Sequence, residues 1–106
     1  MFITYPPHVP SQPQEKFRIY NNRGEIRESS NVPRIFLRAR MYPGLKISRT
    51  IGDLIPHQIG VISEPQFNTI ELQPTQDKFI IMATDGLWDH LNPEDVFEII
   101  NDMTQS

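Results

Sequence analysis

The chain contains no cysteine, which excludes disulfide bonds, thiolate metal sites and cysteine nucleophiles. It also lacks long apolar stretches, because its runs of apolar residues are far shorter than the roughly 20 residues that a membrane-spanning helix needs. The first 13 residues have neither the basic start nor the apolar segment of a secretory signal. These absences predict a soluble, cytoplasmic or nuclear protein that makes no contact with membranes.

Charged residues are unevenly distributed along the chain. Acidic residues are missing between Ser29 and Gly52, whereas from Asp77 to Asp102 acids greatly outnumber the single Lys78. The acid-free segment carries five positive charges, at Arg34, Arg38, Arg40, Lys46 and Arg49. One interpretation is that the basic and acidic segments complement each other across the fold or are simply solvated surfaces. The other is that a basic rim for phosphorylated ligands lies beside an acidic pocket for cations. Net charge -3 and the lack of an interleaved aromatic and basic motif argue against nucleic acid as a partner.

A length of 106 residues with 38% hydrophobic residues suits one small domain with a modest core. Four of the ten prolines fall in residues 1–13. Because proline favours extended backbone and lacks a backbone donor, this stretch is predicted to be an extended arm. Residues 14–106 are then the domain.

The first half of the domain shows mixed helix and strand signals. Residues 15–22 are predicted to form a short helix, and residues 25–27 to begin a strand. Residues 32–40 contain Pro33, which favours an irregular or edge strand over a central one. Apolar and polar residues alternate in residues 45–49, the pattern of a half-buried strand.

The second half is predicted to contain a hairpin followed by a helix. Residues 67–72 and the apolar residues 78–84 flank a Gln-Pro-Thr-Gln turn, so antiparallel pairing is expected. Asn92 and Pro93 provide a cap and a first-turn proline for the helix. Its apolar stripe is expected to lie against a sheet and comprises Val96, Phe97, Ile100 and Met103.

Asp85 and Gly86 follow the apolar run directly. On turn chemistry alone, an Asp-Gly pair in this position favours a simple turn. A carboxylate at the end of a buried strand is also a common way to hold a ligand for a hard cation. Both interpretations remain open at this level.

Three segments together resemble the metal-dependent serine/threonine protein phosphatases of type 2C, the PPM-type family. Residues 43–53 (PGLKISRTIGD) are similar to the family's Gly-Leu-x-x-Ser-Arg-x-x-Gly-Asp segment, and residues 59–65 (IGVISEP) to the Gly-Val-x-x-x-Pro stretch that follows it. Residues 79–89 resemble the family's apolar strand ending in Asp-Gly-Leu-Trp-Asp. The resemblance extends from about residue 8 to Met103 and covers the later part of the catalytic domain.

The resemblance implies an α/β fold, specifically part of an αββα sandwich with mostly antiparallel central sheets flanked by helices. It implies hydrolysis of phosphoserine and phosphothreonine in a phosphoprotein substrate by a water that two Mg or Mn ions activate. Several aspartates hold these ions in the family, and Asp85 matches one of them. The family's other aspartate-bearing segments have no counterpart in these 106 residues.

Two hypotheses follow. The first is a segment of a phosphatase domain that is inactive as this chain alone, because one carboxylate cannot hold two metal ions. The second is a non-catalytic, phosphatase-like binding or structural module, whose exposed sheet edges a protein partner covers.

Other polar and aromatic residues have simpler interpretations. Ser48 and Arg49 are interpreted as structural hydrogen-bonding residues, because Ser48 has no base close to it in the sequence and the family uses water. Trp88 is predicted to be a core anchor. The three histidines, His8, His57 and His90, are interpreted as surface or loop residues.

Overall fold

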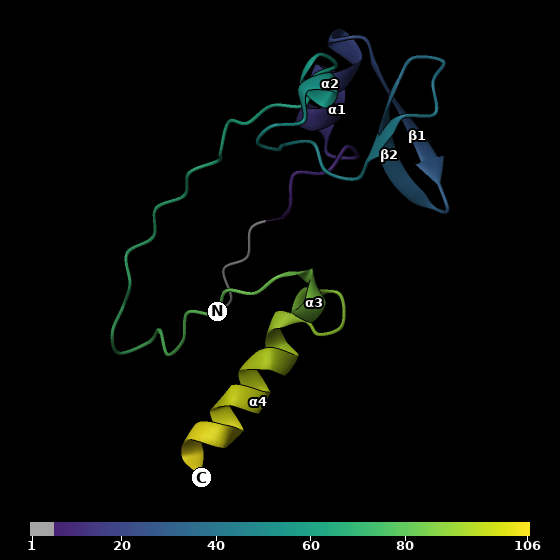
Figure 1. The fold of residues 1–106 in the computed structure, drawn as a ribbon. Helices are drawn as coiled ribbons and strands as arrows, with labels where there is room; N and C mark the ends of the chain where they lie inside the picture. The colour runs from purple at the N-terminus through teal and green to yellow at the C-terminus, as the bar shows by residue number, and fades with distance from the viewer. Residues whose placement is uncertain (1–5) are drawn as a thin grey trace. The chain divides into compact units, whose positions relative to one another are not determined.

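The computed structural model describes residues 6–106, so residues 1–5 of the predicted arm lie outside the described residues. The described chain divides into two compact units, residues 6–68 and residues 69–106. The first unit contains α1 (Pro13–Asn21), β1 (Gly24–Ser29), β2 (Val32–Leu37), β3 (Pro43–Leu45) and α2 (Leu54–His57). The second contains α3 (Asp85–Trp88) and α4 (Pro93–Gln105) (Figure 1). Helices combined with an antiparallel sheet give the α/β class that the sequence predicts.

Helix α1 begins with Pro13 in its first turn, where the missing backbone N–H costs no helical hydrogen bond. It ends before Arg23, which has a positive φ of 66°. The predicted helix is therefore confirmed, shifted by one or two residues. Its buried side chains are Glu15 and Ile19, whereas Phe17 is 70% exposed.

The sheet has the strand order β1-β2-β3, and both pairs are antiparallel. Ser30 and Asn31 both have positive φ and connect β1 to β2 in a two-residue turn, the geometry that suits a hairpin. For residues 32–40, the prediction of an edge strand is wrong, because β2 lies in the centre of the sheet. The prediction of an irregular strand is confirmed, because the register of β2 with β3 shifts between Ile35 and Phe36. Pro33 is tolerated there because β3 pairs with β2 only at Ile35 and Phe36.

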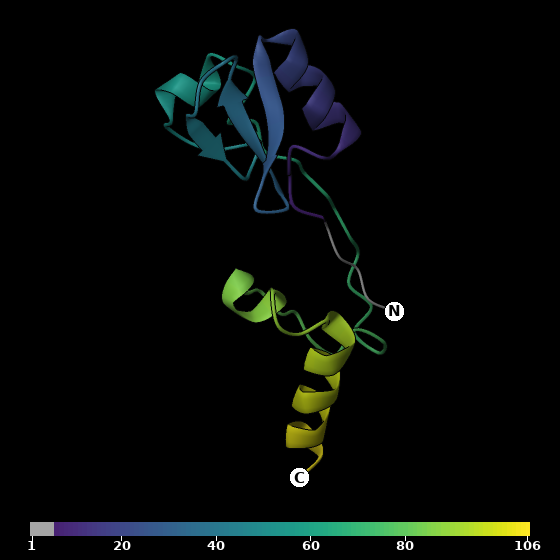
Figure 2. The same ribbon diagram turned by 90° about the vertical axis from the view of Figure 1, so that its right-hand side faces the viewer.

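The core of the first unit lies between α1, the sheet and residues 59–61. It consists of Ile19, Ile35, Ile59 and Val61. Figure 2 shows α1 beside β1. A side chain at Gly60 would come within 2.7 Å of the Cα of Ile19, and its φ of 97° also favours glycine. This glycine therefore lets the chain pass directly against α1.

The prediction of a half-buried strand at residues 45–49 is wrong for most of its length, because residues 46–48 belong to no strand and Ile47 is exposed. Strand β3 ends at Leu45, and beyond it Arg49 forms one isolated parallel bridge with Ile62. The backbone N–H of Thr50 donates to the carbonyl of Ile62 over 3.0 Å. This bridge places Ser48 and Arg49 beside Ile62, two residues before Glu64.

The predicted hairpin of residues 67–72 and 78–84 is wrong, since both segments lie outside every strand of the described chain. Their turn does form, with the backbone N–H groups of Gln76 and Asp77 donating to the carbonyl of Gln73. The expected burial also fails, because Met82 is 90% exposed. An apolar run becomes a strand only where another strand pairs with its backbone. Residues 78–84 have no such partner strand in the described chain.

Helix α4 begins as predicted. The side chain of Asn92 accepts from the backbone N–H of Asp95, and the Asp95 carboxylate accepts in return from the backbone N–H of Asn92. The expected packing on a sheet is wrong within this unit, where the stripe instead meets the Phe79 ring through Phe97, at a centroid distance of 5.9 Å. Among residues 6–106, no helix is long and apolar enough to cross a membrane.

Candidate functional site

Asp85 is the first residue of α3 and follows the extended residue Thr84. The Asp85 side chain is exposed, and the Asp85 backbone carbonyl accepts a hydrogen bond from the backbone N–H of Asp89 over 2.9 Å. The indole Nε1 of Trp88 donates to the carbonyl of Ala83 over 3.0 Å and links the short helix to the segment that precedes it. Gly86 lies within α3 without a positive φ, so its glycine geometry is not what turns the chain.

The described residues do not fit a binuclear metal site by themselves. Within residues 6–106, no group of three or more histidine, aspartate or glutamate side chains is arranged to hold a metal ion. Mg and Mn need several oxygen ligands arranged around each ion. Asp85 can therefore supply one ligand, and the remaining ligands are not assembled by this part of the chain.

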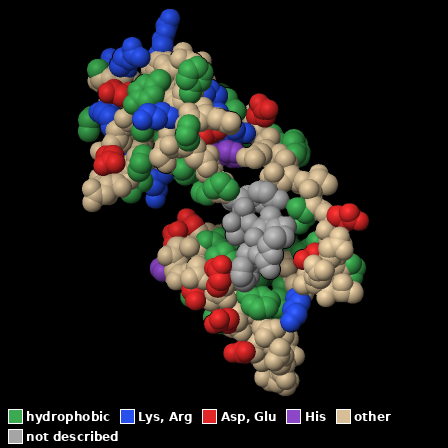
Figure 3. All heavy atoms as spheres, turned by 180° about the vertical axis from the view of Figure 1, so that it is seen from behind, with side chains coloured by type: hydrophobic (Ala, Val, Ile, Leu, Met, Phe, Trp, Pro, Cys, Tyr) green, Lys and Arg blue, Asp and Glu red, His purple; other side chains and the backbone are tan. Residues whose placement is uncertain are grey.

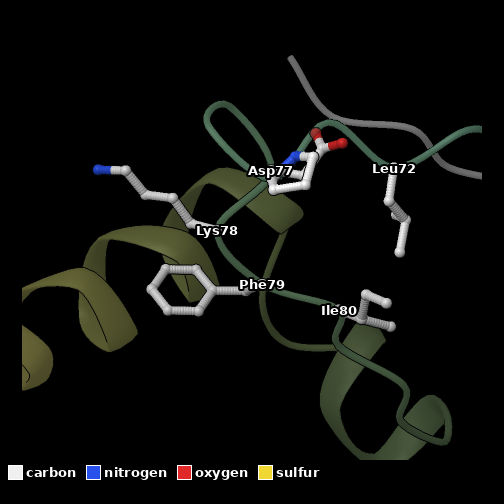
Figure 4. Close-up of a pocket in the computed structure, with 6 residues that line it drawn as sticks. Leu72, Asp77, Lys78, Phe79 and Ile80 are labelled. Atoms are coloured by element: carbon white, nitrogen blue, oxygen red, sulfur yellow. The ribbon is translucent and has the colours of Figure 1, made fainter.

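A hollow of about 410 Å³ lies on the second unit, close to the predicted ligand in sequence (Figure 4). Its lining is largely apolar and consists of Leu72, Pro74, Asp77, Lys78, Phe79 and Ile80. Figure 4 shows the Phe79 ring beside α4, in agreement with its contact to Phe97. Asp85 is not part of this lining, so the hollow is not the predicted metal site.

The most completely built polar cluster lies in the first unit, around the carboxylate of Glu15. This side chain is 1% exposed and accepts from Ser48 Oγ over 2.6 Å. Arg18 contacts the same carboxylate over 2.5 Å, and Arg49 contacts it over 2.8 Å. Two guanidiniums therefore share one buried carboxylate, and charge-assisted bonds of this kind are roughly twice as strong as neutral ones.

The same two arginines also bind backbone carbonyls from distant segments. Arg18 Nε donates to the Gly60 carbonyl over 2.7 Å, and another nitrogen of its guanidinium donates to the Ser48 carbonyl over 3.1 Å. Arg49 donates to the Glu64 carbonyl over 2.9 Å. The cluster thus ties α1 to residues 43–53 and 59–65, the segments that resemble the phosphatase motifs.

The charged state of the cluster follows from these contacts. Burial acts to raise the pKa of Glu15, but hydrogen bonds from Arg18, Arg49 and Ser48 outweigh it and hold that pKa well below its usual range. Its hydrogen bond to Glu15 raises the pKa of Arg49 in turn. The cluster is therefore an ionised structural network at neutral pH.

The interpretation of Ser48 and Arg49 as structural residues is confirmed, since both bind Glu15 and Ser48 is completely buried. Sequence reasoning missed the central role of Glu15. The only local signal for it was the spacing of Glu15 and Arg18, three residues apart on a helix. Arg49 lies 34 positions away, so a local pattern could not identify it as a partner.

His57 and Trp88 have local contacts, whereas His8 contacts a residue far away in the chain. His8 Nε2 lies 2.8 Å from Gln66 Oε1, and His57 Nε2 lies 2.9 Å from the Thr50 carbonyl. The prediction of a core anchor at Trp88 is wrong within the described unit, because this side chain is 37% exposed. Its indole N–H is satisfied locally, so burial is not needed to pair it.

Comparison with known proteins identifies the family. The family model "Protein phosphatase 2C" matches residues 4–106. The chain belongs to the protein phosphatase 2C family. No solved structure gives a significant match.

Three relatives from plants are similar to this chain. The chain is 37% identical to "Probable protein phosphatase 2C 52" of Arabidopsis thaliana, over 90% of this chain and 21% of that relative. It is 35% identical to "Probable protein phosphatase 2C 61" of the same species, over 86% of this chain and 28% of that protein. A rice relative, "Probable protein phosphatase 2C 73" of Oryza sativa subsp. japonica, is 34% identical over 90% of this chain and 23% of its own length. The chain therefore spans about a quarter of the length of these relatives.

Proposed function

We propose that this chain is a segment of a metal-dependent phosphoserine and phosphothreonine phosphatase, and that the rest of a protein phosphatase 2C domain must complete it. The observation that carries this proposal is the position of Asp85. It lies at the start of α3, at the end of the extended run that matches the family's Asp-Gly-Leu-Trp-Asp segment. A phosphoprotein is the substrate class, and the cytoplasm or nucleus is the proposed location.

Asp85 is the proposed metal ligand, and its exposure leaves the carboxylate open to a cation. Bound Mg or Mn lowers the pKa of a coordinated water and neutralises phosphate charge. This chain presents the Asp85 carboxylate at the start of α3. Because α3 is short, its dipole stabilises the negative charge only weakly. One such ligand does not assemble a catalytic site, so the isolated chain is proposed to be inactive.

A second candidate is a non-catalytic module that binds a protein partner. Residues 69–84 favour it, because they belong to no strand and several of their apolar side chains are exposed, with Ile80 at 70% and Met82 at 90%. The outer sides of β1 and β3 are also sheet edges within the described chain. Unpaired edges and extended segments of this kind accept a partner strand readily.

An activity assay separates the two candidates. The 106-residue chain and the whole protein that contains this segment are each assayed for Mn-dependent hydrolysis of a phosphopeptide. We expect activity only from the whole protein, and expect Asp85→Asn to lower both its activity and its Mn affinity measured by calorimetry. Glu98→Gln removes the same charge from an exposed position of α4 and serves as the control.

Activity of the isolated chain would contradict the proposed inactivity. An inactive whole protein that still binds a partner through residues 69–84 would favour the non-catalytic module. Unchanged activity and Mn affinity in the Asp85→Asn variant would overturn the assignment of Asp85 as a ligand.

A further inference from the structure

The two units carry opposite charges. Residues 6–68 contain nine Lys and Arg against five Asp and Glu, a net charge of +4, whereas residues 69–106 contain one Lys against eight acids, a net charge of −7. In the space-filling view, Lys and Arg side chains gather on the unit that contains the sheet, and Asp and Glu side chains on the unit that contains α4 (Figure 3). The proposed function accounts for part of the acidic unit through Asp85, but leaves the excess of cations unexplained.

The sheet positions part of this positive charge. In the register of β1 and β2, Arg27 lies directly opposite Arg34. Because side chains alternate along a strand, both arginines face away from Ile26 and Ile35, which pack against the core. Like charges in directly opposed positions destabilise a sheet.

Local contacts hold these two arginines in place, and only the charge of Arg27 is offset by a carboxylate, that of Glu25. The guanidinium of Arg27 lies 4.2 Å from the centroid of the Phe36 ring and 3.7 Å from the Glu25 carboxylate. Arg34 donates to the Gly44 carbonyl over 2.7 Å. Since a carbonyl carries no net charge, Arg34 keeps its full positive charge on this face.

Three further cations lie just beyond the ends of β2 and β3. Arg38 and Arg40 lie in the loop that connects these strands, and Lys46 directly follows β3. All three side chains are exposed, and none forms a hydrogen bond or ion pair with any residue in the described part of the chain. We call the five cations together the basic surface: Arg27, Arg34, Arg38, Arg40 and Lys46.

We propose that the basic surface binds an acidic segment of the phosphoprotein substrate, one that carries Asp and Glu near the phosphorylated residue. This inference rests on the proposed function for the identity of the partner, and on charge complementarity for its chemistry. The cations follow a strand and its connecting loop, so they suit an extended peptide with several carboxylates better than one isolated phosphate. Met41, 83% exposed in the same loop, offers such a peptide an apolar contact.

Binding is measured by fluorescence anisotropy with the 106-residue chain and labelled peptides. One peptide carries a phosphoserine between Asp and Glu residues, a second is the same without phosphate, and a third has Asn and Gln in place of the acids. We expect the two acidic peptides to bind, the neutral peptide to bind at least about tenfold more weakly, and affinity to fall as salt rises. The triple variant Arg38→Gln, Arg40→Gln, Lys46→Gln is expected to lose about tenfold in affinity for the acidic peptides.

Lys78→Gln is the matched control, because it removes the one cation of the other unit and should leave binding unchanged. The three substituted side chains of the triple variant have no partners in the described chain, and unchanged circular dichroism confirms that the variant is folded. Equal binding of the neutral peptide, or equal binding by the triple variant, overturns the proposal. A concentration-dependent dimer that blocks the peptide assigns the surface to a second copy of this chain, and preferential binding of RNA assigns it to nucleic acid; either result also overturns the proposal.

The failure of this inference is distinguishable from failure of the proposed function. The unphosphorylated acidic peptide reports on the basic surface without any hydrolysis. Conversely, the whole protein can hydrolyse a neutral phosphopeptide even when the basic surface plays no part. Loss of peptide selectivity with hydrolysis retained therefore counts only against the basic surface.

Discussion

Glu15→Gln should destabilise the unit of residues 6–68 by about 2–4 kcal/mol at neutral pH. The substitution keeps the shape of the side chain but removes the negative charge that Arg18 and Arg49 share. Removing one partner of a fully buried ion pair costs about 3–5 kcal/mol. Here both arginine side chains are 20% exposed, so water recovers part of that cost.

The cost of this substitution should also depend on pH. The pKa of Glu15 in the folded chain lies below its ordinary value of 4.5. Its charged form therefore stabilises the fold above about pH 4.5, and this contribution is lost as pH falls toward the folded-state pKa. Below pH 4.5 this group alone contributes a slope of about 1.4 kcal/mol per pH unit, which the Glu15→Gln variant lacks.

Urea titrations followed by the NMR amide signals of β2 measure the stability of the first unit separately from that of the second. We expect the difference between the original chain and the Glu15→Gln variant to be largest near neutral pH and to shrink as pH falls below about 4.5. Glu28→Gln is the control, because Glu28 is exposed and should change stability by less than about 0.5 kcal/mol. A difference that stays constant with pH, or that matches the control, would refute the assignment of Glu15 as the charged centre of the cluster.

Three further substitutions test the packing and the helix cap. Gly60→Ala should lower the free energy of unfolding in urea by more than about 2 kcal/mol, because the added methyl group meets α1 and the backbone is also in the strained left-handed region. Gly52→Ala has the same backbone strain but open space around the methyl group, and should cost only about 1–2 kcal/mol. Equal costs would contradict the close approach of Gly60 to α1. Asn92→Ala should lower the helicity of α4 measured by circular dichroism and cost about 1 kcal/mol, and an unchanged spectrum would contradict the cap. Ile35→Val should cost about 0.5–1.5 kcal/mol in the first unit, and the absence of any change would argue against its central place in the core.

The elements that sequence reasoning predicted well depend on neighbouring residues. Pro13 near the start of α1, and Asn92 with Pro93 at the start of α4, act within one helical turn of their own positions. The turn after Gln73 likewise closes through hydrogen bonds between residues only a few positions apart. Signals of this kind can be read from a short window because both interacting groups lie inside it.

Predictions failed where the partner lies far away in the chain. Pro33 argued for an edge strand, but the outcome depended on where β3 begins to pair with β2. The apolar run of residues 78–84 argued for a buried strand, yet no strand in the described chain accepts its hydrogen bonds. An apolar pattern identifies a segment that can be buried, but not the segment that covers it.

By itself the sequence determined the family resemblance, the α/β class, the local helix starts and the position of Asp85 after an apolar run, because each depends on residue types at fixed short spacing. Only the tertiary structure decided that Glu15 is the buried centre of an ion cluster with Arg18, Arg49 and Ser48, and that Arg27 opposes Arg34 on the outer face of the sheet. Burial, shared charge and strand register arise when distant segments come together. They therefore become visible only once the chain is folded.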